Sequence, residues 1–302
     1  MTPSPGLDCH QHLWPPELLD ALARRRQSPR ISGRLLLLDG EPPYLVDPAD
    51  HDPRRRAQLA ADDDLERVLV SLSSPLGIEY LPPDEAEPLL EAWHDGVRAL
   101  GPPFGGWAAT GLAEPDAGAL RKALSDHDLV GLQLPACALA TPTKLDALGP
   151  LLAVLEELDR PLLVHPGPAP TSGEQSPAWW SALVPYVAQL HAAWHSWHVA
   201  GRRSHPRLRV CFVALAGLAP LHHERLAARG GDLGRVDPDV FYETSSYGTR
   251  AVDAMVRVVG VDVLVHGSDR PYAGPAALDL GVALPHALRV SNPQRLLHGS
   301  RA

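Results

Sequence analysis

Four side chains able to bind a divalent metal ion follow apolar segments of this sequence. His10 and His12 close the run GLDCHQH, His165 closes PLLVH, and Asp269 follows VLVHGS. Imidazole nitrogens and carboxylate oxygens are ligands of zinc and other borderline divalent ions. Such an ion lowers the pKa of bound water, and a carboxylate such as that of Asp269 can accept the released proton. These residue types therefore indicate metal-assisted chemistry.

Each motif taken alone also has a simpler explanation. A His-x-His pair arises by chance in a chain with 15 histidines, and His165 can be a structural residue at the end of a strand. Asp269 can instead cap the segment that follows it. Two histidines two residues apart do project to one side of a strand, however. A shared site is favoured because all four residues stand at the carboxyl ends of predicted strands.

Short apolar segments alternate with longer amphipathic segments along the chain. Strands are predicted at residues 6–12, 67–72, 106–110, 129–134, 161–165, 208–213, 240–244 and 263–268. Helices are predicted near 15–25, 84–100, 116–125, 145–158, 177–201, 220–229, 249–259 and 274–287, with a short turn after Asn292. This alternation is typical of an α/β fold, the (β/α)8 TIM barrel, in which all strand ends meet at one mouth. An open doubly wound sheet is the alternative, but no GxGxxG follows the first strand.

One segment interrupts the alternation in the first loop from strand to helix. Residues 32–47, which contain RLLLLDGEPPYLV, predict a β-hairpin around Asp39-Gly40. The Pro-rich patches elsewhere are typical of loops rather than of linkers between domains. We therefore expect a single barrel domain over residues 1–302.

The composition limits the partners and the setting of the protein. A formal net charge of −9 offers no basic face for nucleic acid or for an anionic membrane surface, so a small-molecule substrate is expected. The cysteines Cys9, Cys137 and Cys211 are scattered and form no CxxC pair, which favours a reducing compartment. The sequence begins without a signal-like apolar run and holds no membrane-length apolar stretch. A cytoplasmic protein is the expectation.

The lysines bear on how many ions the site holds. A second metal usually needs a bridging ligand, and a lysine carbamate is one way to provide it. The chain has Lys122 in a predicted helix and Lys144 in a predicted loop, and neither stands at a strand end. A mononuclear site is therefore favoured.

Several segments carry a resemblance to a known family. They are D-x-H-x-H at Asp8, His10 and His12, V-H-P at residues 164–166, H-P-R-L-R-V at 205–210, G-S-D-R-P-Y at 267–272 and N-P-x-R-L-L at 292–297. Over nearly the whole chain the sequence resembles the amidohydrolase superfamily, specifically the amidohydrolase-related branch that contains aminocarboxymuconate semialdehyde decarboxylase and resorcylate-type decarboxylases.

The resemblance implies one divalent ion per chain, usually Zn²⁺ with Mn²⁺ as another candidate, bound by His10, His12, His165 and Asp269. Asp269 and His165 are the expected catalytic residues. The implied reaction is hydrolysis or nonoxidative decarboxylation of a small carboxylated or cyclic organic substrate, and the two are left open. Members of this branch often form dimers, so a homodimer is one expectation.

One position departs from the family pattern. The sixth strand of the family resembles F-A-H-x-G-G, with a histidine that helps to activate water or substrate, whereas this chain reads FVALAG and has Ala214 at that place. Alanine can neither move a proton nor offer a lone pair. One alternative is therefore a barrel whose catalysis has lapsed and that binds a small molecule, and another is a metal-free, lactonase-like enzyme.

A few further residues have two interpretations. Trp179 and Trp180 are interpreted as helix packing rather than as pocket lining, and His191 and His195 as an outer or subunit-contact face of one helix. Arg270 can meet a substrate carboxylate or form a structural ion pair. Tyr247, in the seventh loop, is a weaker candidate for substrate contact.

Overall fold

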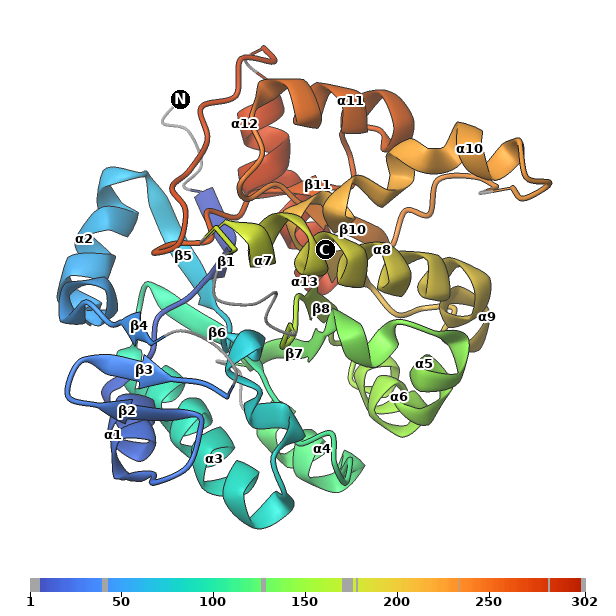
Figure 1. Cartoon of the computed structure of the whole chain (residues 1–302). Coiled ribbons are helices and arrows are strands. Elements are labelled where there is room, and N and C mark those ends of the chain that lie inside the picture. The colour runs from blue at the N-terminus through green and yellow to red at the C-terminus, as the bar shows by residue number, and fades with distance from the viewer. Residues whose placement is uncertain are drawn as a thin grey trace.

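A computed structural model describes residues 6–39, 43–125, 129–169, 176–177, 179–232, 234–281 and 283–299. One sheet has eight parallel strands whose order in space follows their order in the chain (Figure 1). They are β1 (Gly6–Gln11), β5 (Leu65–Val70), β6 (Phe104–Ala108), β7 (Leu129–Pro135), β8 (Leu162–His165), β9 (Val210–Phe212), β10 (Val240–Glu243) and β11 (Leu264–Val265).

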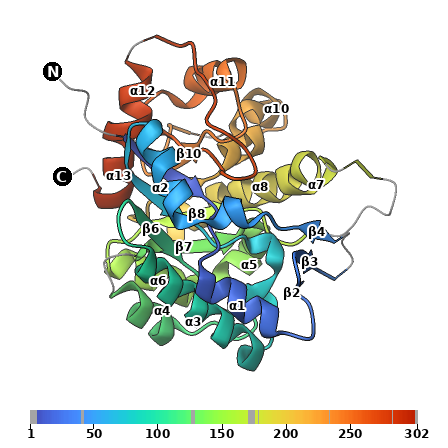
Figure 2. The same cartoon turned by 90° about the vertical axis from the view of Figure 1, so that its left-hand side faces the viewer.

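The two edges of this sheet are joined beyond the end of β11. The backbone N–H of Cys9 donates to the carbonyl of His266 at 2.9 Å, and that of Asp269 donates to the carbonyl of His10 at 3.0 Å. The sheet is thus a closed barrel, and helices surround it on the outside (Figures 1 and 2). The expected (β/α)8 barrel is confirmed, and the open sheet is wrong.

The α-helices of the described residues are α1 (Pro16–Arg24), α2 (Pro53–Asp62), α3 (Pro83–Leu100), α4 (Ala117–Leu124), α5 (Pro142–Ala147), α6 (Gly149–Glu157), α7 (Trp180–Leu183), α8 (Pro185–Ser196), α9 (Arg202–Ser204), α10 (His223–Ala227), α11 (Thr249–Val259), α12 (Leu284–His286) and α13 (Asn292–His298). Two π-helical turns, Trp197–Gly201 and Ala287–Ser291, continue α8 and α12.

Two helical expectations differ from the structure. Helix α2 was not expected because PRRRAQLAAD is mostly polar, yet Asp52 caps it by accepting the N–H of Arg54 at 2.9 Å and Pro53 starts it. The helix expected over residues 274–287 is present only from Leu284. Pro275 removes a backbone donor, and Gly281 adopts a φ of 85°, so the apolar pattern between them does not continue as a helix.

The insertion in the first loop is a small antiparallel sheet. Strands β3 (Leu35–Leu37) and β4 (Tyr44–Leu45) pair as the expected hairpin, with Leu35 opposite Leu45, and β2 (Arg30–Ser32) adds a third strand. Gly40 in the expected turn lies outside the described residues. Figure 2 shows this sheet beside the mouth of the barrel, so it contributes to the rim above the strand ends.

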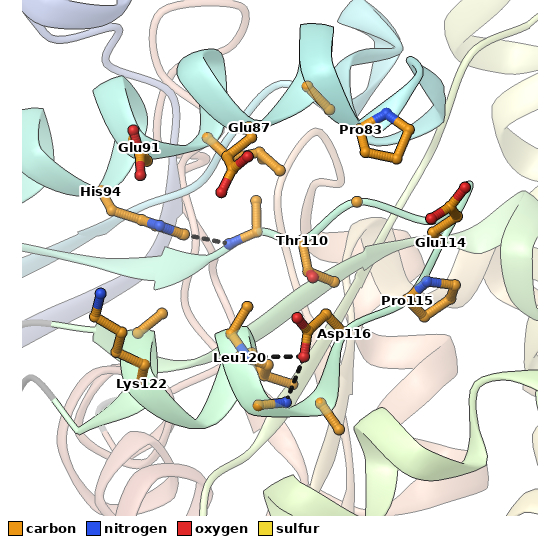
Figure 3. Close-up of a pocket in the computed structure, with 18 of the residues that line it drawn as sticks. Pro83, Glu87, Glu91, His94, Thr110, Glu114, Pro115, Asp116, Leu120 and Lys122 are labelled. Atoms are coloured by element: carbon orange, nitrogen blue, oxygen red, sulfur yellow. Dashed lines mark hydrogen bonds between the residues drawn. The ribbon is translucent and has the colours of Figure 1, made fainter.

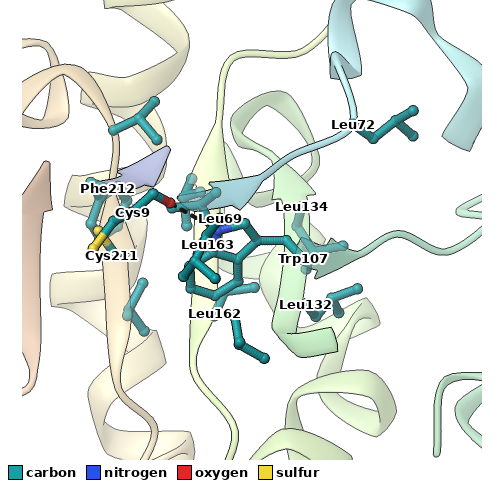
Figure 4. Packing of buried hydrophobic residues seen from close by; sticks show 14 of the residues in the cluster. Cys9, Leu69, Leu72, Trp107, Leu132, Leu134, Leu162, Leu163, Cys211 and Phe212 are labelled. Carbon is teal, nitrogen blue, oxygen red and sulfur yellow. Dashed lines mark hydrogen bonds between the residues drawn. The ribbon is translucent and has the colours of Figure 1, made fainter. Parts of the chain in front are cut away.

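Apolar side chains and two thiols fill the interior of the barrel. Cys9, Leu163 and Cys211 are fully buried and lie together in Figure 4, and all three cysteines of the chain are free. The indole N–H of Trp107 donates to the carbonyl of Cys9 at 3.0 Å, which satisfies the polar atom of a buried aromatic side chain. Burial of side chains of this size stabilises the fold by about 1.5–3 kcal/mol each. This layer supports the strand ends from below.

No helix in the described part of the chain has the length and apolar character needed to span a membrane.

Candidate metal centre

The four side chains singled out in the sequence meet at the carboxyl ends of the strands. His10 lies in β1 and His12 just beyond it, His165 ends β8, and Asp269 follows β11. Their ligand atoms all lie within 4.8 Å of one another, so the group could hold a metal ion. The three imidazoles are buried, whereas the side chain of Asp269 is 22% exposed and therefore faces the mouth.

The spacing of the ligand atoms matches a shared ion. The Nε2 atom of His12 lies 3.2 Å from Nε2 of His10 and 3.2 Å from Nε2 of His165. Two nitrogens bound to one zinc at about 2.1 Å are about 3.0 Å apart at a right angle and about 3.4 Å apart at a tetrahedral angle. The Oδ1 atom of Asp269 lies 3.3 Å from Nε2 of His12 and 3.8 Å from that of His10, which extends the same arrangement.

The outer nitrogen of each imidazole is held by a hydrogen-bond acceptor. The Nδ1 atom of His10 lies 3.2 Å from a carboxylate oxygen of Glu243, that of His12 lies 3.0 Å from the carbonyl of Ser71, and that of His165 lies 2.8 Å from the carbonyl of Pro166. An Nδ1–H donor leaves the lone pair on Nε2. Three lone pairs consequently point at one another, an arrangement that a cation between them stabilises and that is common around ligating histidines.

The environment favours the protonation states that a metal needs. Burial lowers the pKa of His12 and lowers that of His165 further, helped by the neighbouring imidazoles. Burial raises the pKa of Asp269, but the neighbouring imidazoles, His12 first among them, outweigh burial and lower that pKa. Burial lowers the pKa of His10, yet Glu243 and the other acids raise it overall. Neutral His12 and His165 and an ionised Asp269 are ligand-competent forms.

Glu243 is a buried partner of the candidate site that the sequence analysis missed. It ends β10, is completely buried, and its Oε2 atom accepts the N–H of Ala214 at 3.1 Å and the hydroxyl of Ser245 at 2.7 Å. Its Oε1 atom accepts the N–H of Ser245 and lies so close to Gly267 that a Cβ there would be 2.2 Å away. These donors and His10 fix the position of the buried carboxylate. The strand sequence VFYE contains no second polar residue at a regular spacing that would have marked Glu243 as part of a site.

Arg56 on α2 was also missed, and it joins the two segments that carry ligands. Its guanidinium is buried, donating to the carbonyl of His12 at 2.7 Å and to that of Arg270 at 3.3 Å. A carboxylate oxygen of Asp8 accepts the N–H groups of His10 at 3.0 Å and of Ser268 at 3.2 Å. Arg56 and Asp8 therefore both fix the relative positions of β1 and the Asp269 loop, which pre-organises the candidate ligands.

Ala214, the departure from the family pattern, begins an unusual turn. Residues 214–218 all have φ between 47° and 66°, which is a left-handed helical turn with Gly217 as its only glycine. Left-handed backbone costs L-residues roughly 1–2 kcal/mol each. The turn begins with the Ala214 N–H bound to Glu243, and the carbonyl of Gly217 accepts from Nε2 of His191 at 2.7 Å. It thus lies between the metal centre and the outer helix α8.

The remaining residues that the sequence analysis singled out lie away from the four candidate ligands or have structural contacts. Arg270 forms an ion pair with Asp63 at 2.7 Å, so its structural interpretation is confirmed. Trp179 is 54% exposed, so the expectation that it packs within helices is wrong: α7 is a single short turn and does not cover it. Lys144 lies in α5 rather than in a loop, but it is still away from any strand end. Tyr247 is half-buried and packs against the apolar core.

Two tyrosines lie beside the centre. The ring of Tyr272 is 5.3 Å from that of His12 and 6.3 Å from that of Tyr44, which belongs to β4 of the small sheet. Both tyrosines are partly exposed. An aromatic wall therefore extends from the ligands toward the inserted sheet.

A separate groove lies away from the candidate metal centre. A groove of about 1210 Å³ runs between α3 and α4 on the outside of the barrel, lined by Glu87, His94 and Asp116 among others (Figure 3). Nε2 of His94 accepts the N–H of Ala109 at 3.1 Å, and Asp116 caps α4 by accepting two backbone N–H groups. In this groove His94 and Asp116 therefore accept backbone hydrogen bonds of the surrounding elements. None of the four candidate ligands lines the groove.

No protein-family model and no curated protein matches the sequence. Solved structures match nearly the whole chain at low identity. They include the apo form of IDCase from Metarhizium anisopliae (TM-score 0.77, 17% identity, 97% of each chain covered). They also include 2,6-dihydroxybenzoate decarboxylase complexed with 2,6-dihydroxybenzoate (0.72, 18%, 97% of this chain and 99% of that chain).

A third is 5-carboxyvanillate decarboxylase from Novosphingobium aromaticivorans DSM 12444, complexed with manganese and 4-hydroxy-3-methoxy-5-nitrobenzoic acid. Its TM-score is 0.69 at 17% identity, with 97% of this chain and 95% of that chain covered. At such identities the likeness establishes the fold, which is the (β/α)8 barrel that the sequence resemblance implied.

Proposed function

We propose that this chain is a metal-dependent enzyme of the amidohydrolase superfamily, in its decarboxylase-containing branch. In this proposal it removes carbon dioxide, without oxidation, from a small aromatic or cyclic carboxylate. The observation that carries the proposal is the convergence of three imidazole Nε2 atoms and one carboxylate at the mouth of the barrel. Decarboxylases that share the fold, one of them with bound manganese, support the choice of reaction.

His10, His12, His165 and Asp269 are the proposed ligands of one divalent ion. When bound, the ion would supply a Lewis acid that neutralises and orients the substrate carboxylate. Asp269 is the proposed proton-transfer residue because it is the most exposed of the four and therefore the one that substrate can reach. His165, which together with Asp269 is a proposed catalytic residue, borders the same space with its Nε2 atom.

The proposed reaction replaces a carboxylate by a proton. A proton reaches the carbon that bears the carboxylate, the bond to that carboxylate breaks, and its electron pair stays with the ring as carbon dioxide leaves. Asp269 is positioned to pass the proton, while Tyr272 and Tyr44 form an aromatic wall against which a planar substrate can stack. In hydrolysis, by contrast, water attacks a carbonyl carbon and the bond from that carbon to its nitrogen or oxygen leaving group breaks, so product analysis separates the two.

The site does not favour a lapsed barrel. All four ligands converge, each Nδ1 atom retains a partner, and Arg56 and Asp8 fix the two segments that carry ligands. Ala214 removes one side chain, but its backbone N–H still binds Glu243. The support for an enzyme therefore comes from a ligand set that is complete without residue 214.

The test combines metal content with a substrate panel. Purified protein is analysed for bound metal and assayed for carbon dioxide and for hydrolysis products on hydroxylated benzoates and cyclic amides. We expect one equivalent of metal, release of carbon dioxide, and loss of both in His10→Ala. Asp269→Asn is expected to lose turnover, and Glu157→Gln on the exposed surface is the control. Protein that binds neither zinc nor manganese would falsify the proposal, and turnover that survives complete chelation would favour a metal-free enzyme instead.

Three finer features belong to the same proposal. Zinc is the proposed ion because three imidazoles and one carboxylate suit its tetrahedral preference, with manganese as the competitor. A homodimer and a cytoplasmic location complete it, in keeping with three free cysteines. Elemental analysis of protein from cells, light scattering in solution and cell fractionation test these three features separately.

A further inference from the structure

A second group of imidazoles lies outside the barrel, on the far side of the left-handed turn. His191 and His195 stand one helical turn apart on α8, and His222 comes from the end of the segment that precedes α10. The ring of His191 is 5.1 Å from that of His222 and 6.4 Å from that of His195. All three rings are at least partly exposed, unlike those of the metal centre.

The shorter of these two distances matches that of imidazoles that share an ion, and the other is longer. In the metal centre the three ring-to-ring distances are 4.9, 5.0 and 4.9 Å. The pair His191–His222 already matches them, and the longer pair is a His-x-x-x-His arrangement on one helical face, a spacing that places two imidazoles on one ion in zinc-binding helices. Binding of one ion by all three imidazoles therefore requires the His195 ring to turn toward the other two.

One ring of this group is already oriented. Nε2 of His191 lies 2.7 Å from the carbonyl of Gly217, so it carries the hydrogen and leaves the lone pair on Nδ1. Gly217 is part of the left-handed turn, and a Cβ at that position would lie 3.2 Å from the His191 ring. This ring therefore has a backbone partner of the kind that orients ligating histidines.

We propose that His191, His195 and His222 form a second, surface site for one divalent transition-metal ion. An all-imidazole donor set suits Zn²⁺, Ni²⁺ and Cu²⁺ and does not suit Mg²⁺ or Ca²⁺, which prefer oxygen. Burial and the neighbouring imidazoles lower the pKa of His195, and burial also lowers that of His191, so both are neutral near pH 7. Neutral imidazole is the form that binds metal. The site does not depend on the proposed function.

Retention of the untagged protein on immobilised Ni²⁺ excludes the buried metal centre, which cannot reach a resin, and variants separate this site from other exposed histidines. We expect wild type to be retained and to elute only with added imidazole. His195→Ala and His222→Ala are expected to elute earlier, and the double variant to flow through. His286→Ala, which removes an exposed histidine of α12, is the matched control and should elute like wild type.

A titration in solution gives the stoichiometry. Chelator-treated protein is dialysed against Zn²⁺ and then analysed for bound metal, with circular dichroism melts to verify that each variant is folded. Wild type is expected to bind a second, weaker equivalent that the double variant lacks, while the tighter equivalent stays. Equal retention and equal second-equivalent binding by wild type and double variant would overturn the proposal. A wild type that binds only the surface equivalent would support this site and contradict the proposed function.

Discussion

The two imidazole groups of this chain differ in what surrounds the same side chains. At the metal centre every Nδ1 atom of His10, His12 and His165 has an acceptor, and the rings are buried. In the surface group the ring of His191 is bound to the backbone carbonyl of Gly217, and the rings reach solvent. Metal affinity depends on how little the ligands reorganise on binding. The inner site should therefore be the tighter one, and it alone should be coupled to the stability of the barrel.

Removal of the inner ion should have the largest effect on stability. A ligand present at 1,000 times its Kd stabilises the folded state by about 4.1 kcal/mol. Chelation should lower the melting temperature of wild type and of the His195→Ala/His222→Ala variant equally, because the inner centre is intact in both. Differential scanning calorimetry with and without chelator measures this. If the double variant lost the effect of chelation, the inner centre would not be the stabilising site.

Acid should destabilise the fold by protonating His51, a buried histidine outside the metal centre. Nδ1 of His51 accepts the N–H of Trp14 at 3.0 Å, and burial with the charge of Arg56 lowers the pKa of His51 to about 4. The unfolded chain binds a proton near pH 6.5, so stability is present above that pH and is lost as pH falls toward 4. The loss from this residue is about 2 kcal/mol by pH 5.

Urea unfolding of chelator-treated protein at pH 7 and pH 5 tests this loss. His51→Gln retains an acceptor that does not titrate, so it should reduce the pH dependence, whereas His286→Gln at an exposed position should not. An unchanged pH dependence in His51→Gln would show that other groups carry the acid sensitivity.

Glu243→Gln should weaken metal binding at the inner group and leave the surface group unchanged, because the histidine that Glu243 contacts, His10, belongs to the inner group. The amide keeps the size of the side chain but loses the charge that faces Nδ1 of His10. We expect zinc affinity at the inner site to fall by about 10–100-fold, the usual effect of such partners. Competition titration with a chromophoric chelator measures it, and retention on immobilised Ni²⁺ should stay as in wild type. Glu157→Gln serves as the control on the exposed surface.

The smallest expected effect concerns the turn that separates the two groups. Ala214→Gly keeps the N–H that binds Glu243 and relieves a φ of 47°, so the free energy of unfolding should rise by about 1 kcal/mol. Gly217→Ala should do the reverse, because a Cβ there would lie 3.1 Å from the carbonyl of Val187. Urea unfolding of both variants tests the pair. Destabilisation by Ala214→Gly would mean that the turn is not strained.

Strand-end positions made the four candidate ligands predictable, because the barrel brings the carboxyl ends of distant strands to one mouth. Glu243 could not be found in the same way, since nothing in VFYE distinguishes a buried partner of His10 from a chance acid. Arg56 was hidden in a polar segment whose helix depends on the cap at Asp52. The left-handed turn could not be predicted because the segment ALAGLA has the apolar composition of a buried helix. Only tertiary contacts select the handedness of the turn.

The contact between Gly267 and Glu243 links two positions that are 24 residues apart in the chain. Any side chain at residue 267 would occupy the volume of the Glu243 carboxylate, so the two positions cannot change independently. A library that varies residue 267 should recover only glycine while residue 243 is glutamate, and should admit alanine once residue 243 is shortened. In homologues that keep this barrel, the two positions should covary as a pair.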